Sequence, residues 1–571
     1  MVKQLLHQSR SFLFKKQTSI LSAAAVIAAT YLTSAILGLV RDRLLAGMFS
    51  PHALGIYLAA DRIPSFIFNL VVIGALSSSF IPVFTTYLSR REEAEAWKAA
   101  SVIINLTLLI FASFSFIVIL TSGSIARLMA PPSATLEDIN LLSALIRLMF
   151  LAQIFLLLSN FLTGLLQSYQ RFLIPALAPI AYNFGVILGI LFLSPTLGLY
   201  GPVWGAVIGA VLHFLIQVPM VRFLGIRYRL SFDCRHPGVA EMIRLAVPRL
   251  FGLAANQVTA LVDTILAASI SFSAVTFFTF AQHLQNLPVS LFGAAIAQAA
   301  LPALSLEAAP ERRTQFKGIF LSALHQMAFL IFPSAAAIFV LRLPIVRLIF
   351  GASQYHWLAT LDTGRVVAFF SLSLFAQAAV YLISRGFFAL HESALPAKIS
   401  LLTVAINVVF SVIFVKWLHL DVWSLSLAFS FSAFLNFFLL LYYFDRRVGA
   451  FNRRLLLLPF VKISLATVFM SLTMFLVLKG LDRGAWGQNI NLGFFPAVSL
   501  DILILDTQYT INLIILTVLS GTVGLLTYFL SAWWLGLSEV EIIAVSFRRT
   551  LALFSRTFRG TGVAEEPTPL P

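Results

Sequence analysis

The sequence predicts an all-α, polytopic membrane protein with about fourteen transmembrane helices. Of its 571 residues, 60% are hydrophobic and only 11% are charged, and the mean hydropathy is +0.94. A soluble domain is about 45–50% apolar and about 25% charged. Apolar windows of about 20 residues, the length that crosses a bilayer as a helix, also recur along the whole chain. These observations exclude a soluble globular protein.

Each of these windows defines one predicted span. The spans are 20–45, 56–88, 99–121, 139–168, 174–194, 202–223, 240–269, 274–304, 318–341, 364–390, 398–417, 423–444, 458–478 and 509–534. Residues 1–19 carry four basic side chains ahead of a long apolar helix and contain no cleavable signal peptide. We therefore expect a cytoplasmic N-terminal segment.

Basic residues in the connections predict the orientation. They concentrate in alternate loops, at Arg90, Arg91, Lys98, Arg171, Arg222, Arg227, Arg229, Arg235, Arg312, Arg313, Lys317, Lys398, Arg446, Arg447, Arg453 and Arg454. Loops on the cytoplasmic side carry this excess, and it also attracts anionic lipids. The pattern predicts that both termini are cytoplasmic, with 541–571 as a cytoplasmic tail. It also explains the net charge of +16 without a nucleic-acid partner.

The chain contains an internal repeat. Asp42–Ala46 (DRLLA) aligns with Asp263–Ala267 (DTILA) at an offset of 221 residues (263 − 42), and Ala60–Arg62 meets Ala281–His283 at the same offset. The repeat predicts two pseudo-symmetric six-helix lobes, 20–225 and 226–450, related by an axis along the membrane normal. A final pair of helices, 451–540, lies outside it.

A charged cluster lies between and within the first two spans. Arg41, Asp42, Asp61 and Arg62 interrupt sequence that is otherwise apolar. A charge at membrane depth costs several kcal/mol unless it faces protein or water, so such residues mark substrate sites. A guanidinium binds phosphate or carboxylate bidentately. We expect Arg41 and Arg62 to bind an anionic substrate and the two acids to orient them; the alternative for Arg41 is an arginine at a helix end that reaches the interface.

Three residues of the second repeat are further candidates. Asp263 is a lone acid in the middle of a predicted span and suggests coupling to a monovalent cation or a proton. Asn407 could supply an oxygen beside it, or could bond neighbouring helices. His283 could bind an anion or titrate, or could be a structural, hydrogen-bonded histidine.

No pattern of an enzyme is present. The nine histidines form no metal-ligand pair with an acid at helical spacing, and the chain has no phosphate-binding P-loop. The single cysteine, Cys234, excludes a disulfide framework and a thiolate metal site. We expect no cofactor and a transporter that uses a gradient. An enzyme such as a glycosyl-lipid ligase would need a periplasmic loop rich in catalytic residues, which 479–508 does not provide.

Longer stretches resemble the lipid II flippase family (MurJ, also called MviN), in the superfamily of multidrug exporters and oligosaccharide-lipid flippases. The similarity covers about residues 25–450, with matching order and spacing. It is carried by SAILGLVRDRLLAGMF (34–49), DRIPSFIFNLVVIGALSSSFIPVFTTYL (61–88), FLIPALAPIAYNFGVILG (172–189), NQVTALVDTILAASI (256–270), ALPALSLEAA (300–309), LPIVRLIFGASQY (343–355) and SRGFFALHESALPAKISLLTVAINVV (384–409).

The resemblance implies a flippase of the bacterial inner membrane that serves peptidoglycan synthesis. Its cargo would be an undecaprenyl-pyrophosphate-linked disaccharide-pentapeptide, moved from the cytoplasmic to the periplasmic leaflet by alternating access, with the lipid tail beside the last two helices. The family's Arg-Asp pair on the first helix maps onto Arg41 and Asp42. Its cation-site aspartate maps onto Asp263, with Asn407 as partner.

The chain departs from the family at several charged positions. Ala35 replaces an arginine, Phe68 and Asn69 replace paired arginines, and the Ala-Asp-Arg signature of the eighth helix reads Ala281–Gln282–His283. Two alternatives therefore stay open. One is an exporter of another lipid-linked glycan or amphipathic compound with the same fold. The other is a non-transporting scaffold that binds envelope-synthesis proteins.

Overall fold

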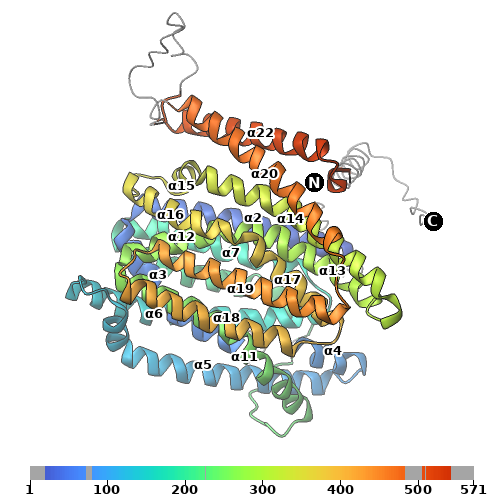
Figure 1. Ribbon diagram of the computed structural model, residues 1–571. Coiled ribbons are helices and arrows are strands. Elements are labelled where there is room, and N and C mark those ends of the chain that lie inside the picture. The colour runs from blue at the N-terminus through green and yellow to red at the C-terminus, as the bar shows by residue number, and fades with distance from the viewer. Residues whose placement is uncertain (1–19, 73–79, 226, 483–504, 508, 542–571) are drawn as a thin grey trace, which may run out of the picture. The chain divides into compact units, whose positions relative to one another are not determined.

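The structure is a computed structural model that describes residues 20–72, 80–225, 227–482, 505–507 and 509–541, with the backbone alone over 20–28 and 247–256. These residues form helices and the turns that join them, besides one isolated bridge between Asp482 and Leu505 (Figure 1). The predicted all-α fold is confirmed.

Two compact units hold these helices. The first contains the described residues of 1–287, 342–373 and 393–436. Its helices are α2 (Ile20–Met48), α3 (Pro51–Val72), α4 (Ile81–Ser89), α5 (Glu93–Met129), α6 (Leu136–Ser168), α7 (Leu173–Leu188), η2 (Gly189–Leu193), α8 (Ser194–Leu197), α9 (Tyr200–Leu215), α10 (Val218–Phe223), α11 (Pro237–Ile270), α12 (Phe272–Pro288), α15 (Arg342–Phe350), α16 (Trp357–Leu372), α18 (Ala394–Val412), η5 (Ile413–Trp417) and the first half of α19 (Trp423–Val448).

The second unit contains the described residues of 288–341, 374–392 and 437–571. Its helices are η3 (Val289–Ala294), α13 (Ala295–Leu306), η4 (Pro310–Arg312), α14 (Arg313–Val340), α17 (Leu374–Ala389), α20 (Arg453–Leu481), α22 (Thr510–Trp534) and the rest of α19. The predicted lobes, 20–225 and 226–450, divide the chain differently and stay a prediction.

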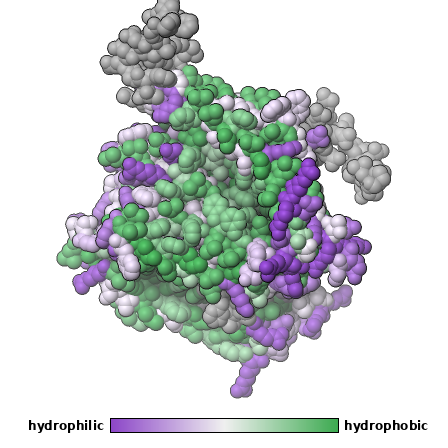
Figure 2. All heavy atoms as spheres, viewed as in Figure 1, coloured by the Kyte–Doolittle hydropathy of each residue, from purple (hydrophilic) through white to green (hydrophobic). Residues whose placement is uncertain are grey.

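Eleven spans in the described residues are long and apolar enough to cross a membrane, and α16 with α17 makes a twelfth when taken together. Two further predicted spans coincide with α2 and α11, of which the stretch Gln257–Ile270 qualifies as a shorter apolar helix. Every predicted span thus overlaps a helix, while the count of fourteen stays a prediction. Figure 2 shows hydrophobic side chains over most of the visible surface, as lipid-facing helices require.

Local sequence fixes several helix starts. Thr135 and Asp138 form a capping box at α6, in which the Asp138 amide donates to Thr135 Oγ1 (3.1 Å) and the Thr135 amide donates to Asp138 Oδ2 (3.0 Å). Asn452 Oδ1 accepts from two amides at the start of α20. Such caps bond helix amides that lack a partner within the helix.

Glycines let α7 and η2 pack against α9 at backbone distance. A Cβ added to Gly185 would lie 2.3 Å from Gly209 Cα, and one added to Gly189 would lie 2.3 Å from Gly205 Cα. Small residues one turn apart allow this close approach between membrane helices. Any larger side chain would force α7 and α9 apart.

In the second unit, α20 and α22 lie side by side. The Tyr528 hydroxyl on α22 donates to the Phe329 carbonyl of α14 at 2.7 Å, which ties this pair to the rest of the unit. An apolar groove of about 440 Å³ lies between α20 and α22. It is lined by Leu476, Val477, Gly480, Leu481, Leu519 and Val523.

Candidate functional site

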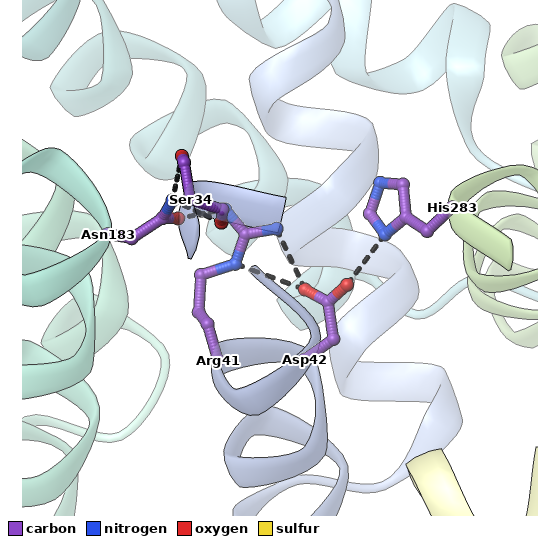
Figure 3. Close-up of polar contacts among 5 residues, drawn as sticks. All are labelled: Ser34, Arg41, Asp42, Asn183 and His283. Atoms are coloured by element: carbon purple, nitrogen blue, oxygen red, sulfur yellow. Dashed lines mark hydrogen bonds and ion pairs between the residues drawn. The ribbon is translucent and has the colours of Figure 1, made fainter. Parts of the chain in front are cut away.

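The cluster on α2 places Arg41 and Asp42 in direct contact. Arg41 donates from Nε and Nη2 to the same oxygen, Asp42 Oδ1, at 3.0 and 2.8 Å (Figure 3). The side chain of Asp42 is 3% exposed, whereas that of Arg41 is 22% exposed. The acid is thus buried, and the side chain of Arg41 is partly exposed.

A third residue, Asn183 on α7, fixes the other side of the guanidinium. Its Oδ1 accepts from Arg41 Nη1 at 3.3 Å. Its Nδ2 in turn donates to Oγ and to the main-chain carbonyl of Ser34, at 3.1 and 3.2 Å. The amide is therefore oriented by α2 while it orients an arginine of the same helix (Figure 3). Sequence reasoning missed Asn183.

His283 on α12 joins the cluster from the second repeat. Its Nδ1 donates to Asp42 Oδ2 at 2.6 Å, so each carboxylate oxygen bonds one cationic or ionisable group. Its side chain is 33% exposed. The sequence placed Arg41, Asp42 and His283 in one substrate site, and the three do lie together.

This arrangement has spare donors for an anion. A guanidinium carries five N–H donors, and Arg41 uses three of them on Asp42 and Asn183 among the described residues. The cluster can therefore bind a phosphate oxygen through the remaining donors of Arg41 without losing its internal bonds.

Arg62 on α3 makes a different contact. Its Nε and Nη2 both donate to the main-chain carbonyl of Ala260 on α11, at 2.9 and 2.7 Å. Asn69, two turns further along α3, donates to Gln257 Oε1 at 3.4 Å. These bonds connect a helix of the first repeat to a helix of the second.

Asp61, the neighbour of Arg62, bonds in another direction. Its Oδ2 accepts from the Ser65 hydroxyl at 2.8 Å, and its Oδ1 lies 3.5 Å from Gln153 Nε2 on α6. The same Gln153 nitrogen donates to Ser65 Oγ at 3.2 Å. Asp61 and Arg62 thus tie α3 to two different helices.

Asp263 and Asn407 form the second predicted group. Asp263, buried on α11, accepts one long bond at Oδ1, from Ser411 Oγ at 3.4 Å. Within the described residues its Oδ2 and both polar atoms of the Asn407 side chain are buried without a hydrogen-bond partner. Ser411 lies one turn beyond Asn407 on α18. Buried polar atoms normally have partners, so this group has unused capacity for a cation or a proton.

The helix ends beyond both groups pack tightly. The Thr276 hydroxyl on α12 donates to the Pro51 carbonyl at the start of α3 (2.7 Å), and a Cβ added to Gly55 would lie 1.7 Å from the Phe272 carbonyl oxygen. Ser353 donates to the Gly47 carbonyl of α2 at 2.9 Å. The predicted orientation puts this sealed end on the periplasmic side.

The family model described as "Lipid II flippase MurJ" matches residues 44–494. "Lipid II flippase MurJ" of Burkholderia cenocepacia is 26% identical over 396 residues, which cover 67% of this chain and 76% of the relative. "Probable lipid II flippase MurJ" of Thermotoga maritima is 27% identical over 462 residues, which cover 80% and 90%.

Two solved structures have a similar fold. "Lipid II flippase MurJ, inward closed conformation" aligns with a TM-score of 0.70 and 21% identity, over 88% of this chain and 98% of that one. An inward-facing multidrug resistance transporter of the MATE family in the MOP superfamily aligns with a TM-score of 0.60 and 15% identity, over 74% and 98%.

Proposed function

The chain belongs to the lipid II flippase MurJ family, and from this premise we propose that it moves the peptidoglycan precursor lipid II from the cytoplasmic to the periplasmic leaflet of a bacterial inner membrane. It is a transporter and not an enzyme. The cargo is the undecaprenyl-pyrophosphate-linked disaccharide-pentapeptide. A pyrophosphate cannot cross about 30 Å of hydrocarbon unaided.

The observation that carries this proposal is the bonded cluster of Arg41, Asp42 and His283, with Arg41 partly exposed. Arg41 binds the pyrophosphate through its free donors, and Asp42 and Asn183 hold the guanidinium in place. His283 adds a second donor group beside it.

The contacts of Arg62 support alternating access. Arg62 holds α3 against α11 in this conformation, and the ends of α3 and α12 are sealed at Gly55 and Phe272. In the opposite conformation these contacts separate, Arg62 leaves Ala260, and its guanidinium becomes available to the pyrophosphate. Asp61 keeps α3 on α6 during this step.

Asp263 and Asn407 supply the coupling site in this scheme. A monovalent cation or a proton binds Asp263 Oδ2 and the Asn407 side-chain oxygen, both of which are buried without a described partner. Asp263 lies one turn beyond Ala260 on α11. A cation or proton bound at Asp263 therefore acts on the segment of α11 that also contains Ala260, the residue to which Arg62 donates.

The lipid tail needs an apolar path of its own. The groove between α20 and α22 is lined by aliphatic side chains and one glycine, which suits an isoprenoid chain. In this proposal both termini are cytoplasmic, as the basic loops predict.

Complementation tests the proposal. A bacterial strain depleted of its lipid II flippase receives the wild-type chain, Arg41→Ala, or Arg127→Ala, an exposed arginine near the end of α5, at matched membrane levels. We expect growth and normal shape with wild type and Arg127→Ala, and lysis with Arg41→Ala. Outer-leaflet lipid II, measured by cleavage with an added enzyme, should follow the same order.

Each other result points elsewhere. If Arg41→Ala restored growth, Arg41 would not be required for pyrophosphate binding. Failure of well-expressed wild type, in this host and in a second host with a related envelope, would favour an exporter of another compound. Growth restored without any rise in outer-leaflet lipid II would indicate a scaffold for envelope-synthesis proteins.

A further inference from the structure

The connection between α10 and α11 is held against α5 along a defined path. We call its described part, residues 227–236, the strap. Asn105 Nδ2 on α5 donates to the carbonyls of Arg229 and Ser231, at 3.4 and 2.8 Å. The Tyr228 hydroxyl donates to Asn105 Oδ1 at 2.6 Å. The Arg229 amide donates to Ser101 Oγ, one turn earlier on α5, at 3.0 Å.

A second anchor fixes the end of the strap. His236 Nδ1 accepts from the Gly238 amide at 3.1 Å, so the proton of the neutral ring lies on Nε2. This Nε2 lies 2.8 Å from Glu95 Oε2, in the first turn of α5. The strap therefore presents its outward side chains from a fixed backbone.

The outward side chains alternate in chemistry. Arg227, Arg229 and Arg235 are exposed. Between them Leu230 is 77% exposed and Phe232 is 52% exposed. Large apolar side chains interleaved with arginines are typical of segments that lie at a bilayer surface.

The position of the strap on α5 matches a bilayer surface. Glu93, Glu95 and Lys98 occupy the start of this helix, and from Leu109 onward its exposed large side chains include a long series of apolar ones, such as Leu109 and Ile110. The strap crosses α5 at Ser101 and Asn105, between these two parts. This is the level of α5 at which we expect lipid headgroups.

We propose that the strap is an interfacial anchor that binds anionic phospholipids. The three arginines pair with headgroup phosphates, while Leu230 and Phe232 enter the boundary of the acyl chains. Asp233, the acid of the strap, faces Lys98 at 3.9 Å, which leaves the arginine charges to the lipid. A soluble phosphate would use the arginines but has no use for the exposed leucine and phenylalanine, so the partner is the membrane surface.

The strap also connects the two repeats, since α10 ends the first and α11 begins the second. A lipid-bound strap holds this connection at a constant depth in the membrane. This inference concerns a site separate from the Arg41 cluster and does not depend on the identity of the cargo.

The chain offers its own reporter for a test. Cys234 is the single cysteine of the sequence and is exposed on the strap. A fluorophore attached to it is read in nanodiscs of phosphatidylcholine alone and in nanodiscs that also contain phosphatidylglycerol, with quencher-labelled lipids of each kind. We expect strong quenching by lipid-borne quenchers, and stronger quenching by the anionic lipid than by the zwitterionic one.

Three variants sharpen the test. The triple variant Arg227→Gln/Arg229→Gln/Arg235→Gln should lower the preference for anionic lipid by roughly fivefold or more, given about 1 kcal/mol per basic residue near an anionic surface. Leu230→Ser/Phe232→Ser should reduce quenching by both lipids. Arg90→Gln/Arg91→Gln, in the neighbouring basic connection between α4 and α5, should leave the preference unchanged.

Several results would overturn the proposal. Equal quenching by both lipids, or a label at Cys234 that responds only to a water-soluble quencher, would place the strap off the membrane. Loss of the preference in the Arg90→Gln/Arg91→Gln control would assign the effect to the overall charge. Abolition of the preference by added glycerol phosphate would indicate a site for a soluble anion. The comparison of lipids with wild type alone decides the proposal if a variant fails to fold.

Discussion

Two junctions between the repeats occupy equivalent positions but bond differently. At the first, Asp42 of the first repeat accepts from His283 of the second. At the second, Arg62 of the first repeat donates to Ala260, one turn before Asp263, in the second. The repeat pairs Asp42 with Asp263 and Arg62 with His283. The two junctions therefore involve corresponding segments, although Arg62 bonds the carbonyl of Ala260 and not the Asp263 side chain.

Two asparagines extend the correspondence. Asn183 on α7 and Asn407 on α18 are 224 residues apart (407 − 183), and each stands six residues before a π-helical segment, η2 at Gly189 or η5 at Ile413 (413 − 189 is again 224). Asn183 bonds Arg41, next to Asp42. Asn407 lies one turn from Ser411, which bonds Asp263.

The two junctions differ in how many oxygens of the aspartate have a hydrogen-bond partner. Both oxygens of Asp42 are bonded, to Arg41 and to His283. At the other junction Arg62 donates to the main-chain carbonyl of Ala260, and Asp263 Oδ2 has no partner among the described residues. The first junction thus has a carboxylate with both oxygens bonded, and the second has a carboxylate oxygen without a described partner.

The largest effect is expected when the satisfied carboxylate loses its charge. Asp42→Asn leaves Arg41 partly buried without a counter-charge, and should lower the free energy of unfolding by about 3 kcal/mol. Thermal unfolding in detergent measures this loss. The control Asp362→Asn removes an exposed (i,i+3) pair with Arg365 and should change stability by less than about 1 kcal/mol. Equal losses of stability in Asp42→Asn and Asp362→Asn would mean that the bonds of Asp42 contribute no more than an exposed ion pair.

The second junction should weaken when its arginine is shortened. Arg62→Gln removes two charge-assisted bonds to Ala260, worth about 2 kcal/mol together. Amide hydrogen exchange in α3 and α11 should accelerate, and Arg62→Lys, which keeps the charge and can still reach a carbonyl, should lie between the variant and wild type. Unchanged exchange in Arg62→Gln would show that other contacts hold these helices together.

A smaller effect is expected when the first junction loses its imidazole. His283→Ala removes the donor to Asp42 Oδ2 but leaves the two bonds from Arg41 to Asp42 Oδ1 in place. We expect the rise in outer-leaflet lipid II to fall by roughly fivefold, given about 1 kcal/mol for one hydrogen bond. His356→Ala, at an exposed position, should match wild type. An undiminished rise with His283→Ala would show that His283 is not needed for substrate binding.

The smallest change in stability is expected at the unsatisfied carboxylate. Asp263→Asn removes a buried charge that has one long bond, so the free energy of unfolding should change by no more than about 1 kcal/mol. Wild type should gain thermal stability when the coupling cation is added or when Asp263 takes up a proton. The variant should gain none. A variant that responds to the same cations and the same pH as wild type would move the coupling site away from Asp263.

The helices and the charged candidate residues could be predicted from sequence because each leaves a local pattern. Apolar windows mark the helices, and charged residues inside such windows marked Arg41, Asp42 and Asp263. The partner of Arg62 could not be predicted, because a main-chain carbonyl such as that of Ala260 has no sequence signature. Ser65 and Gln153 were missed for a related reason, since polar uncharged residues in membrane helices are common.

Asn183 is a residue of the first junction that could not be recognised from its local sequence. It resembles any helix-bonding asparagine when read alone, yet the repeat that aligns Asp42 with Asp263 also relates it to Asn407, the candidate partner of Asp263. The aspartates differ by 221 residues and the asparagines by 224, so the offset drifts along the repeat and hides the match.

The substitution Gly55→Ala should shift the conformational equilibrium of the protein. Alanine is the better helix former by about 1 kcal/mol, so Gly55→Ala leaves α3 itself intact. Its methyl group, however, would overlap the Phe272 carbonyl oxygen, a penalty confined to the conformation in which these backbones touch. The added methyl group thus destabilises this conformation and shifts the population toward molecules in which α3 and α12 have separated. The second state could be trapped this way without substrate, inhibitor or antibody.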